Sequence, residues 1–287
     1  SFNDIAFEPI VHDGMFDMTE FAISYCNFFN GVSRKHAEVC REMYKDSNQK
    51  AKEKLKRERP VATNITNAVN RKFYQPEEME ELLEETLLEL KSIKIIGGNV
   101  TLDNISREDA EKLVSAIADE ELERVSALMI KNGIRELEAI RSEQSSSGAR
   151  ILPKLGEEAV KIDPDAFIMI FGRRMAEYKR PNFVFEPVPV TEGDIEAWRA
   201  VVRDARKMGK KAQIVFMGKA HRTDDEGKKI IQRILHLAKY DEELKGTIVF
   251  IEDYNTQVAQ AVIKLATTAL NNPIPPMEAS GTSGMKF

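Results

Sequence analysis

The residues best suited to chemistry form the run Glu-Ala-Ser-Gly-Thr-Ser-Gly-Met-Lys at 278–286. Its glycines, serines and threonine offer consecutive backbone amides and hydroxyl groups. If a helix begins there, its N-terminus would favour a phosphate. The same composition is also typical of a simple turn. The run therefore indicates an anion site only if other elements bring further cations to it.

Polar groups also follow four short apolar segments in the second half of the chain. In chain order they are Gly172-Arg173-Arg174, Gly218-Lys219-Ala220-His221, Glu252-Asp253-Tyr254 and Asn271-Asn272. Arginine can bind phosphate in a bidentate manner, and Lys179 adds another fixed positive charge. We therefore expect one or two anion sites here. The glycine spacing matches neither a dinucleotide fingerprint nor a P-loop, so the ligand is not named by it.

Parallel strands must position these groups. The apolar segments at 167–171, 214–217 and 248–251 do not alternate with polar residues, which is typical of strands covered on both faces. Helical patterns at 195–208, 227–237 and 256–265 separate the segments, and a short fourth strand is expected near 269–270. The second half therefore predicts half of a doubly wound α/β domain, in which ligands bind beyond the carboxyl ends of the strands.

The first half of the chain has a helical period instead. Apolar residues at helical spacing predict a helical region at 15–45, interrupted at Gly31, with a buried apolar stripe over 15–29. Further helices are expected from Pro76 to about Leu90, after an N-cap at Ser106 that precedes Asp109, and over 122–140. The Lys- and Arg-rich segment 45–59 is interpreted as a solvated helix or loop. We interpret 75–147 as a packed helical layer, with an arm or interface as the alternative.

The composition limits the possible functions. The chain has 287 residues, 42% hydrophobic and 31% charged, and a net charge of −5. This charge does not favour nonspecific nucleic-acid binding, and no apolar run approaches the roughly 20 residues of a membrane span. Two cysteines indicate thiols in a reducing compartment, and four histidines without ligand spacing predict no metal site. We therefore expect a cytoplasmic protein without nucleic-acid or membrane partners.

Several motifs, taken together and in order, resemble the glycogen and maltodextrin phosphorylases, especially the shorter α-glucan phosphorylases. Residues 278–287 resemble their cofactor-lysine motif, and 173–181 (Arg-Arg-Met-Ala-Glu-Tyr-Lys-Arg-Pro) resemble their phosphate-binding motif. Further matches lie at 30–39, 66–69, 213–221, 250–254 and 270–273. The resemblance covers about 12–287 and is weak from 90 to 163.

The resemblance implies roles for particular residues. Lys286 would hold pyridoxal phosphate covalently. The cofactor phosphate would be bound by Arg173, Tyr254, Thr282 and Ser283. The catalytic group would be Lys286, Arg174 and Lys179, of which Arg174 and Lys179 bind the substrate phosphate, with Lys219 as a further candidate cation. The glucosyl unit would contact Asn67, Tyr178, Glu278, Ser280 and Gly281.

The resemblance also implies a fold and a reaction. The family has two Rossmann-like lobes of the GT-B glycosyltransferase type, and we expect both to be incomplete here. We place a mostly helical part of the N-terminal lobe at 1–155 and the first part of the cofactor-binding lobe at 156–287. The implied reaction is reversible phosphorolysis of α-1,4-linked glucan (glycogen, starch or maltodextrin) by inorganic phosphate to glucose 1-phosphate, with retention, and the implied assembly is a homodimer.

Some positions depart from the family pattern. Ala68 replaces the usual glycine, Tyr74 replaces a tryptophan near the cofactor ring, and 182–193 is unusual. Because the family extends further at both ends, we expect a fragment that is inactive alone. Two alternatives to a phosphorylase are a glycosyltransferase that uses a nucleotide sugar, which would not need a lysine at 286, and a noncatalytic carbohydrate-binding or regulatory relative.

Overall fold

A computed structural model gives the structure of the chain and describes residues 11–12, 15–26, 28–45, 49, 63–143, 151–152, 154–155, 158–190 and 193–287. Most of the basic segment 45–59 and the polar segment 144–148 lie outside these residues. The chain divides into two compact units, one of Ser1–Ala68 with Pro275–Thr282 and one of Val69–Ile274 with Ser283–Phe287. The lobe boundary between 155 and 156 stays a prediction.

The described residues of the first unit form two short helices and two small strand pairs. The strands are β1 (Val11–His12), antiparallel to β2 (Met15–Phe16), and β3 (Asn30–Gly31), parallel to β4 (Thr63–Asn64). Helix α1 spans Met18–Tyr25 and α2 spans Arg34–Met43, so the predicted interruption near Gly31 is confirmed. Asp17 caps α1 by accepting hydrogen bonds from the backbone amides of Thr19 and Glu20.

The predicted buried stripe over 15–29 is wrong. Met15 and Phe16 form a strand instead of a helical turn, and 74% of Met15 is exposed. Met18 and Phe28 are exposed as well. Of the described hydrophobic residues at 15–29, only Ile23 is buried. Helical spacing indicates a face that can be buried, but burial also needs a neighbouring element to cover that face.

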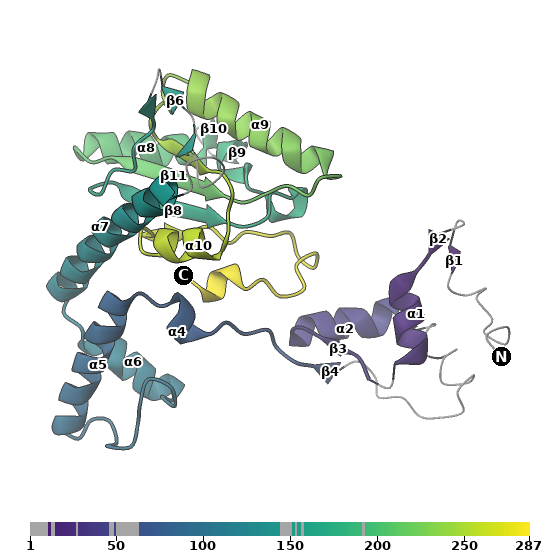
Figure 1. Ribbon diagram of the computed structural model, residues 1–287, viewed down its shortest axis with the longest axis horizontal. Coiled ribbons are helices and arrows are strands. Elements are labelled where there is room, and N and C mark those ends of the chain that lie inside the picture. The colour runs from purple at the N-terminus through teal and green to yellow at the C-terminus, as the bar shows by residue number, and fades with distance from the viewer. Residues whose placement is uncertain are drawn as a thin grey trace. The chain divides into compact units, whose positions relative to one another are not determined.

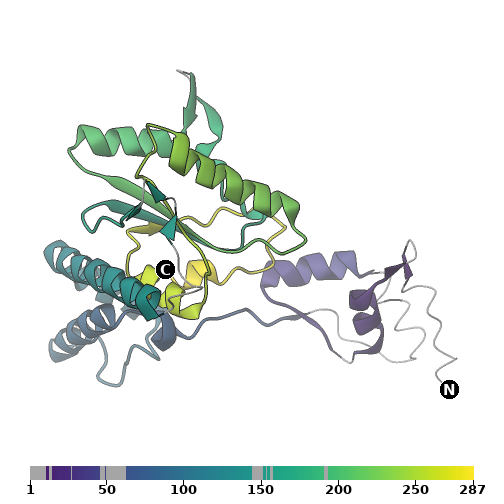
Figure 2. The same cartoon turned by 45° about the horizontal axis from the view of Figure 1, so that its top comes forward.

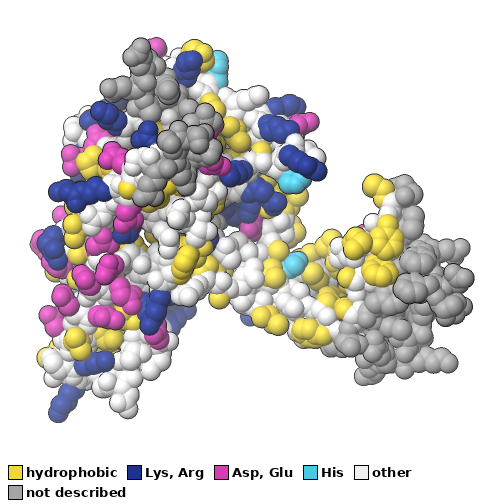
Figure 3. All heavy atoms as spheres, viewed as in Figure 1, with side chains coloured by type: hydrophobic (Ala, Val, Ile, Leu, Met, Phe, Trp, Pro, Cys, Tyr) yellow, Lys and Arg dark blue, Asp and Glu magenta, His cyan; other side chains and the backbone are white. Residues whose placement is uncertain are grey.

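The second unit begins with four helices, α4 (Arg71–Tyr74), α5 (Glu77–Ser92), α6 (Arg107–Ala116) and α7 (Asp119–Glu143). The predicted starts of α5 after Pro76 and of α6 after Ser106 are confirmed; the Ser106 hydroxyl accepts the Asp109 amide at 3.1 Å. Leu87, Leu90, Ile96 and Leu113 form a small core between α5 and α6. Acidic side chains gather over α5 and α7 (Figure 3).

A five-stranded sheet forms the centre of this unit (Figure 1). Its order is β13 (Thr268–Ala269), β8 (Phe167–Gly172), β11 (Ala212–Met217), β12 (Ile248–Ile251) and β5 (Ile151–Leu152). The first four strands are parallel, as the apolar segments predicted, and β5 is antiparallel to β12. The carboxyl ends of β8, β11 and β12 therefore meet at one edge of the sheet.

Helices cover both faces of the sheet (Figure 2). On one face, α7 and α10 (Thr256–Ile263) pack on Ile168, Val215 and Val249 through side chains such as Leu137 and Val258. On the other, α8 (Ala197–Lys207) and α9 (Asp225–Tyr240) pack on Phe216 and Phe250 through Trp198 and Ile234. Neighbouring residues of each strand enter opposite cores, which explains the unalternating apolar sequence.

Shorter elements complete the described structure. Strands β6 (Lys154–Leu155) and β7 (Glu158–Ala159) form one hairpin, and β9 (Pro187–Val190) and β10 (Gly193–Glu196) form another. The 3₁₀ turns are η3 (Glu177–Lys179), η4 (Phe183–Phe185) and η5 (Ser283–Met285). Because η5 has only three residues, the Gly-Ser-Thr run does not begin an α-helix. No described helix combines the length and apolar character that crossing a membrane requires.

Candidate cofactor and phosphate site

The backbones that follow β8 and β11 stay hydrogen-bonded to each other beyond the carboxyl ends of the two strands. The backbone amide of Arg173 donates to the carbonyl of Met217, and that of Met175 donates to the carbonyl of Lys219, both at 3.1 Å. Gly218 lies between the two bonds with φ +158°, and a Cβ there would lie 1.9 Å from the Arg173 carbonyl oxygen. Only glycine fits this close approach.

The loop after β8 concentrates positive charge. Arg173 is 4% exposed and Lys179 is 9% exposed, so two cations are buried close to the carboxyl end of the sheet. Arg174 is exposed, and its guanidinium donates to the Tyr178 hydroxyl at 3.0 Å. The Lys179 ammonium lies 5.0 Å from the centroid of the Tyr178 ring. Tyr178 therefore lies against the two cations predicted to bind the substrate phosphate.

The next two strand ends contribute an ion pair and a partly buried phenol. Lys219 after β11 pairs with Asp253 after β12 at 2.7 Å. Asp253 has a φ of +63°, a conformation that favours residues with short polar side chains. Tyr254 follows it and packs against the core of α7 and α10. Burial raises the pKa of Tyr254, although the nearby charge of Lys286 opposes that change, so Tyr254 stays a neutral hydrogen-bonding group.

Lys286 lies in the second unit against an aromatic face. Its ammonium is 4.4 Å from the centroid of the Tyr74 ring, within the range of a cation–π interaction. Both residues line a cavity of about 410 Å³ between α4, the end of α10, β13 and the Lys286 segment. Gln260 on α10 donates to the Phe73 carbonyl at 2.8 Å, which attaches α4 to α10. Arg71, at the start of α4, pairs with Glu80 and Asp103.

The segment around Lys286 also approaches the ends of two strands. A Cβ on Gly172, the last residue of β8, would lie 3.4 Å from Cζ of Phe287. A Cβ on Gly284 would lie 2.7 Å from Nδ2 of Asn271, just after β13. Lys286 is therefore flanked by residues that contact the carboxyl edge of the sheet. The sequence assigned no role to Phe287 and identified Asn271 only as a polar residue after a strand. Helical or strand periodicity cannot indicate such contacts between loops.

Of the remaining predicted residues, Ser283 begins η5 in the second unit, and the first unit holds Asn67, Glu278, Ser280, Gly281 and Thr282. Two side chains position the segment they belong to. The Ser33 hydroxyl donates to the Ala279 carbonyl at 2.6 Å, and the Asn67 amide donates to the Ser280 carbonyl at 3.3 Å. Ser33 also caps α2 by accepting the His36 amide at 3.0 Å. The sequence could have drawn attention to Ser33 only through its position before a helix, within the motif at 30–39. Its contact with Ala279 carries no such local signal, because the two residues are 246 positions apart in the sequence.

Comparison with known proteins decides the family. The sequence model described as carbohydrate phosphorylase matches residues 6–287. The chain belongs to the carbohydrate phosphorylase family. It is 34% identical over 274 residues to glycogen phosphorylase of Aquifex aeolicus (strain VF5), covering 94% of this chain and 35% of that protein. It is 29% identical over 272 residues to maltodextrin phosphorylase of Thermococcus litoralis, covering 94% and 29%. The chain thus spans about a third of the length of these relatives.

The geometry fits the cofactor that the resemblance to phosphorylases implies. An amine lies on the face of an aromatic ring in a cavity of about 410 Å³, large enough for a small planar molecule. Tyr74 supplies this aromatic face, against which a planar ring can pack. The buried Arg173 adds a fixed positive charge just after β8. In the described part of the chain, no group of three or more His, Cys, Asp or Glu is placed to hold a metal ion.

Proposed function

We propose that this chain provides part of an α-glucan phosphorylase, which cleaves α-1,4-linked glucan with inorganic phosphate to release glucose 1-phosphate. The substrates would be glycogen, starch or maltodextrin. The observation that carries the proposal is the position of Lys286, whose ammonium lies 4.4 Å from the Tyr74 ring in a chain of the carbohydrate phosphorylase family. The names of the relatives from Aquifex aeolicus and Thermococcus litoralis support the substrate class.

Lys286 is proposed to hold pyridoxal phosphate. Its amine would make the covalent link, while Arg173, Tyr254, Thr282 and Ser283 would hold the phosphate group. The bound cofactor supplies a phosphate whose second pKa, about 6, suits proton exchange near neutral pH. Burial of Arg173 supports its assignment, because a charge held away from water interacts more strongly with an anion.

Arg174 and Lys179 are proposed to bind the attacking phosphate. Two phosphates brought side by side repel one another, so the site needs several cations. Lys179 offers a buried charge, and Arg174 offers an exposed guanidinium that can turn from the Tyr178 hydroxyl toward an incoming anion. Lys219 would add a further charge if the anion competes with Asp253 for its ammonium. These cations would lower the energy of the transition state as negative charge gathers there.

The glucosyl unit is proposed to contact Asn67, Tyr178, Glu278, Ser280 and Gly281. The Ser33 and Asn67 hydrogen bonds to the carbonyls of Ala279 and Ser280 support this role, because they fix the backbone of the segment that would hydrogen-bond the sugar. The proposal extends to the whole protein: two Rossmann-like lobes of the GT-B type, a pair of identical subunits, and a place in the cytoplasm. Family membership supports these features.

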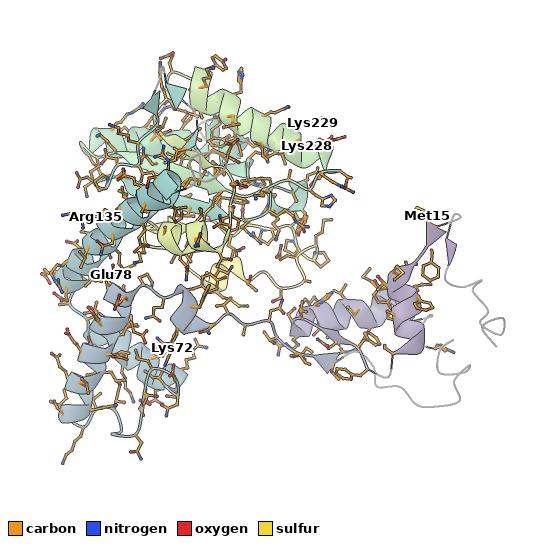
Figure 4. The ribbon with its side chains drawn as sticks, in the orientation of Figure 1. Met15, Lys72, Glu78, Arg135, Lys228 and Lys229 are labelled. Carbon is orange, nitrogen blue, oxygen red and sulfur yellow. The ribbon has the colours of Figure 1, made fainter. Side chains whose placement is uncertain are left out.

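Two substitutions in the whole protein test the proposal. Lys286→Ala should abolish both cofactor absorbance and phosphorolysis. Arg174→Ala should raise the KM for phosphate at least about tenfold, because a charge-assisted bond to phosphate is lost. Arg135→Ala is the matched control, since Arg135 is exposed on α7 (Figure 4). Retained phosphorolysis in Lys286→Ala, or an unchanged KM for phosphate in Arg174→Ala, would contradict the assigned roles.

A further inference from the structure

A second cavity lies at the edge of the sheet where the strands begin, opposite the edge that carries Arg173 and Lys219. Its volume is about 700 Å³. It is lined by residues at or just before the starts of β8, β11 and β12, namely 160–164, 210–213 and 245–247. Val202 and Arg206 of α8 complete the lining. Because these strands are parallel, the cavity is separated from the proposed catalytic loops by the length of the sheet.

The buried side chain of Gln213 holds the segments that line this cavity together. Gln213 is 5% exposed, and its side-chain oxygen accepts the backbone amide of Asp163 at 2.8 Å. Its side-chain nitrogen donates to the carbonyls of Lys161 and Gly246 at 2.9 and 3.0 Å. The side-chain amide of Gln213 therefore connects β11 to the segments that precede β8 and β12. The cavity is pre-formed, so a ligand would not have to order it.

The lining is strongly basic although the chain as a whole is acidic. Its described residues include one carboxylate, Asp163, and five basic side chains, Lys161, Arg206, Lys210, Lys211 and Lys245. Asp163 is neutralised by Lys211 at 2.6 Å. Arg206 donates to the Glu243 carbonyl at 2.7 Å, and neither Arg206 nor Lys210 forms an ion pair with a described carboxylate. A cleft lined by one sign of charge concentrates counter-ions.

Five other lining residues are apolar. Val160, Ile162 and Pro164 lie on one side, and Val202 and Ala212 form part of the cavity between α8 and β11. A bare phosphate ion would fill only a small part of this cavity. A volume of about 700 Å³ falls in the range of small-molecule sites, which combine an apolar lining with a few polar groups. We propose that this cavity binds a small organic phosphate, a phosphate ester with an apolar body, between Arg206 and Lys210.

Calorimetry with 1-naphthyl phosphate on the full chain tests this site. We expect saturable binding of 1-naphthyl phosphate. Inorganic phosphate, which lacks the apolar body, and neutral 1-naphthol, which lacks the phosphate group, should each bind at least about tenfold more weakly. The double variant Arg206→Glu, Lys210→Glu should weaken binding at least about tenfold. The control Lys228→Glu, Lys229→Glu changes two exposed lysines of α9 (Figure 4) and should leave binding within about twofold.

Two more measurements separate this site from the proposed catalytic one and from a folding defect. Binding should persist in Arg174→Ala, whatever becomes of phosphorolysis. In the unmutated chain, bound 1-naphthyl phosphate should slow acetylation of Lys210 and Lys245 but not of Lys228. Failure of 1-naphthyl phosphate to bind, equal weakening by both double variants, or unchanged acetylation of Lys210 would overturn the proposal.

Discussion

The ammonium of Lys286 lies 4.4 Å from the centroid of the Tyr74 ring, although the two residues are far apart in sequence. Helix α4 carries Tyr74 at its last position, and the bond from Gln260 to the Phe73 carbonyl fixes that end of the helix. The ring therefore reaches Lys286 from an anchored backbone. This pairing positions the one amine that the proposed cofactor needs.

Tyr74→Ala should weaken binding of pyridoxal phosphate. The substitution removes the aromatic face that would pack against the cofactor ring, and an aromatic pair contributes about 0.5 to 1.5 kcal/mol, so we expect the Kd to rise about twofold to twelvefold. Tyr74→Phe keeps the ring and should bind within about twofold of the parent. Titration of absorbance with pyridoxal phosphate measures both. Equal affinities of the Ala and Phe variants would argue against the contact.

Gly218→Ala should destabilise the protein by about 2 kcal/mol or more. The new methyl group would lie 1.9 Å from the Arg173 carbonyl oxygen, so the paired backbones of the two strand ends must separate. Gly98→Ala is the control, because a Cβ there meets no atom within 4 Å. Urea unfolding of both variants measures the difference. A Gly218→Ala protein as stable as the Gly98→Ala protein would show that this edge can relax.

The parallel sheet could be predicted because its signal is local. Unalternating apolar residues in β8, β11 and β12 reflect burial on both faces, and Ser106 caps α6 within three residues of sequence. The antiparallel pairing of β9 with β10 was not predicted, because Pro187 and Pro189 have no backbone N–H to donate and are more typical of loops than of strands. The stripe at 15–29 was assigned to a core because periodicity cannot tell whether another element covers it.

Lys264→Ala should cost about 2 kcal/mol of stability. The Lys264 ammonium lies 2.7 Å from Glu136 and 3.5 Å from Glu78, and its side chain is largely shielded from water. Removing it leaves Glu78, near the contact of α5 and α7 (Figure 4), without its cation. Lys228→Ala, which breaks only an exposed pair with Asp225, should cost about 0.5 kcal/mol or less. Similar losses in urea unfolding would contradict a special role for Lys264.

The same network predicts a dependence of stability on pH. Burial tends to raise the pKa of Glu78, but its bonds with Asn132 and Lys264 outweigh burial and lower it. A depressed folded-state pKa means that the ionised carboxylate stabilises the protein above about pH 4.5, and that this contribution is lost as pH falls through the folded-state value. Glu78→Gln should therefore reduce the loss of stability between about pH 5 and about pH 3. An unchanged acid profile would exclude this group as a source.

The candidate site could be predicted only in part. The sequence placed Arg173, Lys219 and Tyr254 at strand ends, which parallel topology brings to one edge. The motif resemblance, and not periodicity, singled out Lys286 and Tyr74. Contacts such as Ser33 with Ala279 join segments 246 residues apart through a single hydroxyl. Such pairs carry no local signal, because the fold alone brings them together.

The proposed function depends above all on Lys286 as the residue that holds the cofactor. The most direct measurement is an absorbance spectrum of the purified chain with added pyridoxal phosphate, followed by borohydride reduction and peptide mapping. We predict a chromophore that reduction traps on Lys286 and that Lys286→Ala lacks. Trapping on other lysines only, or an equal chromophore in Lys286→Ala, would contradict the claim.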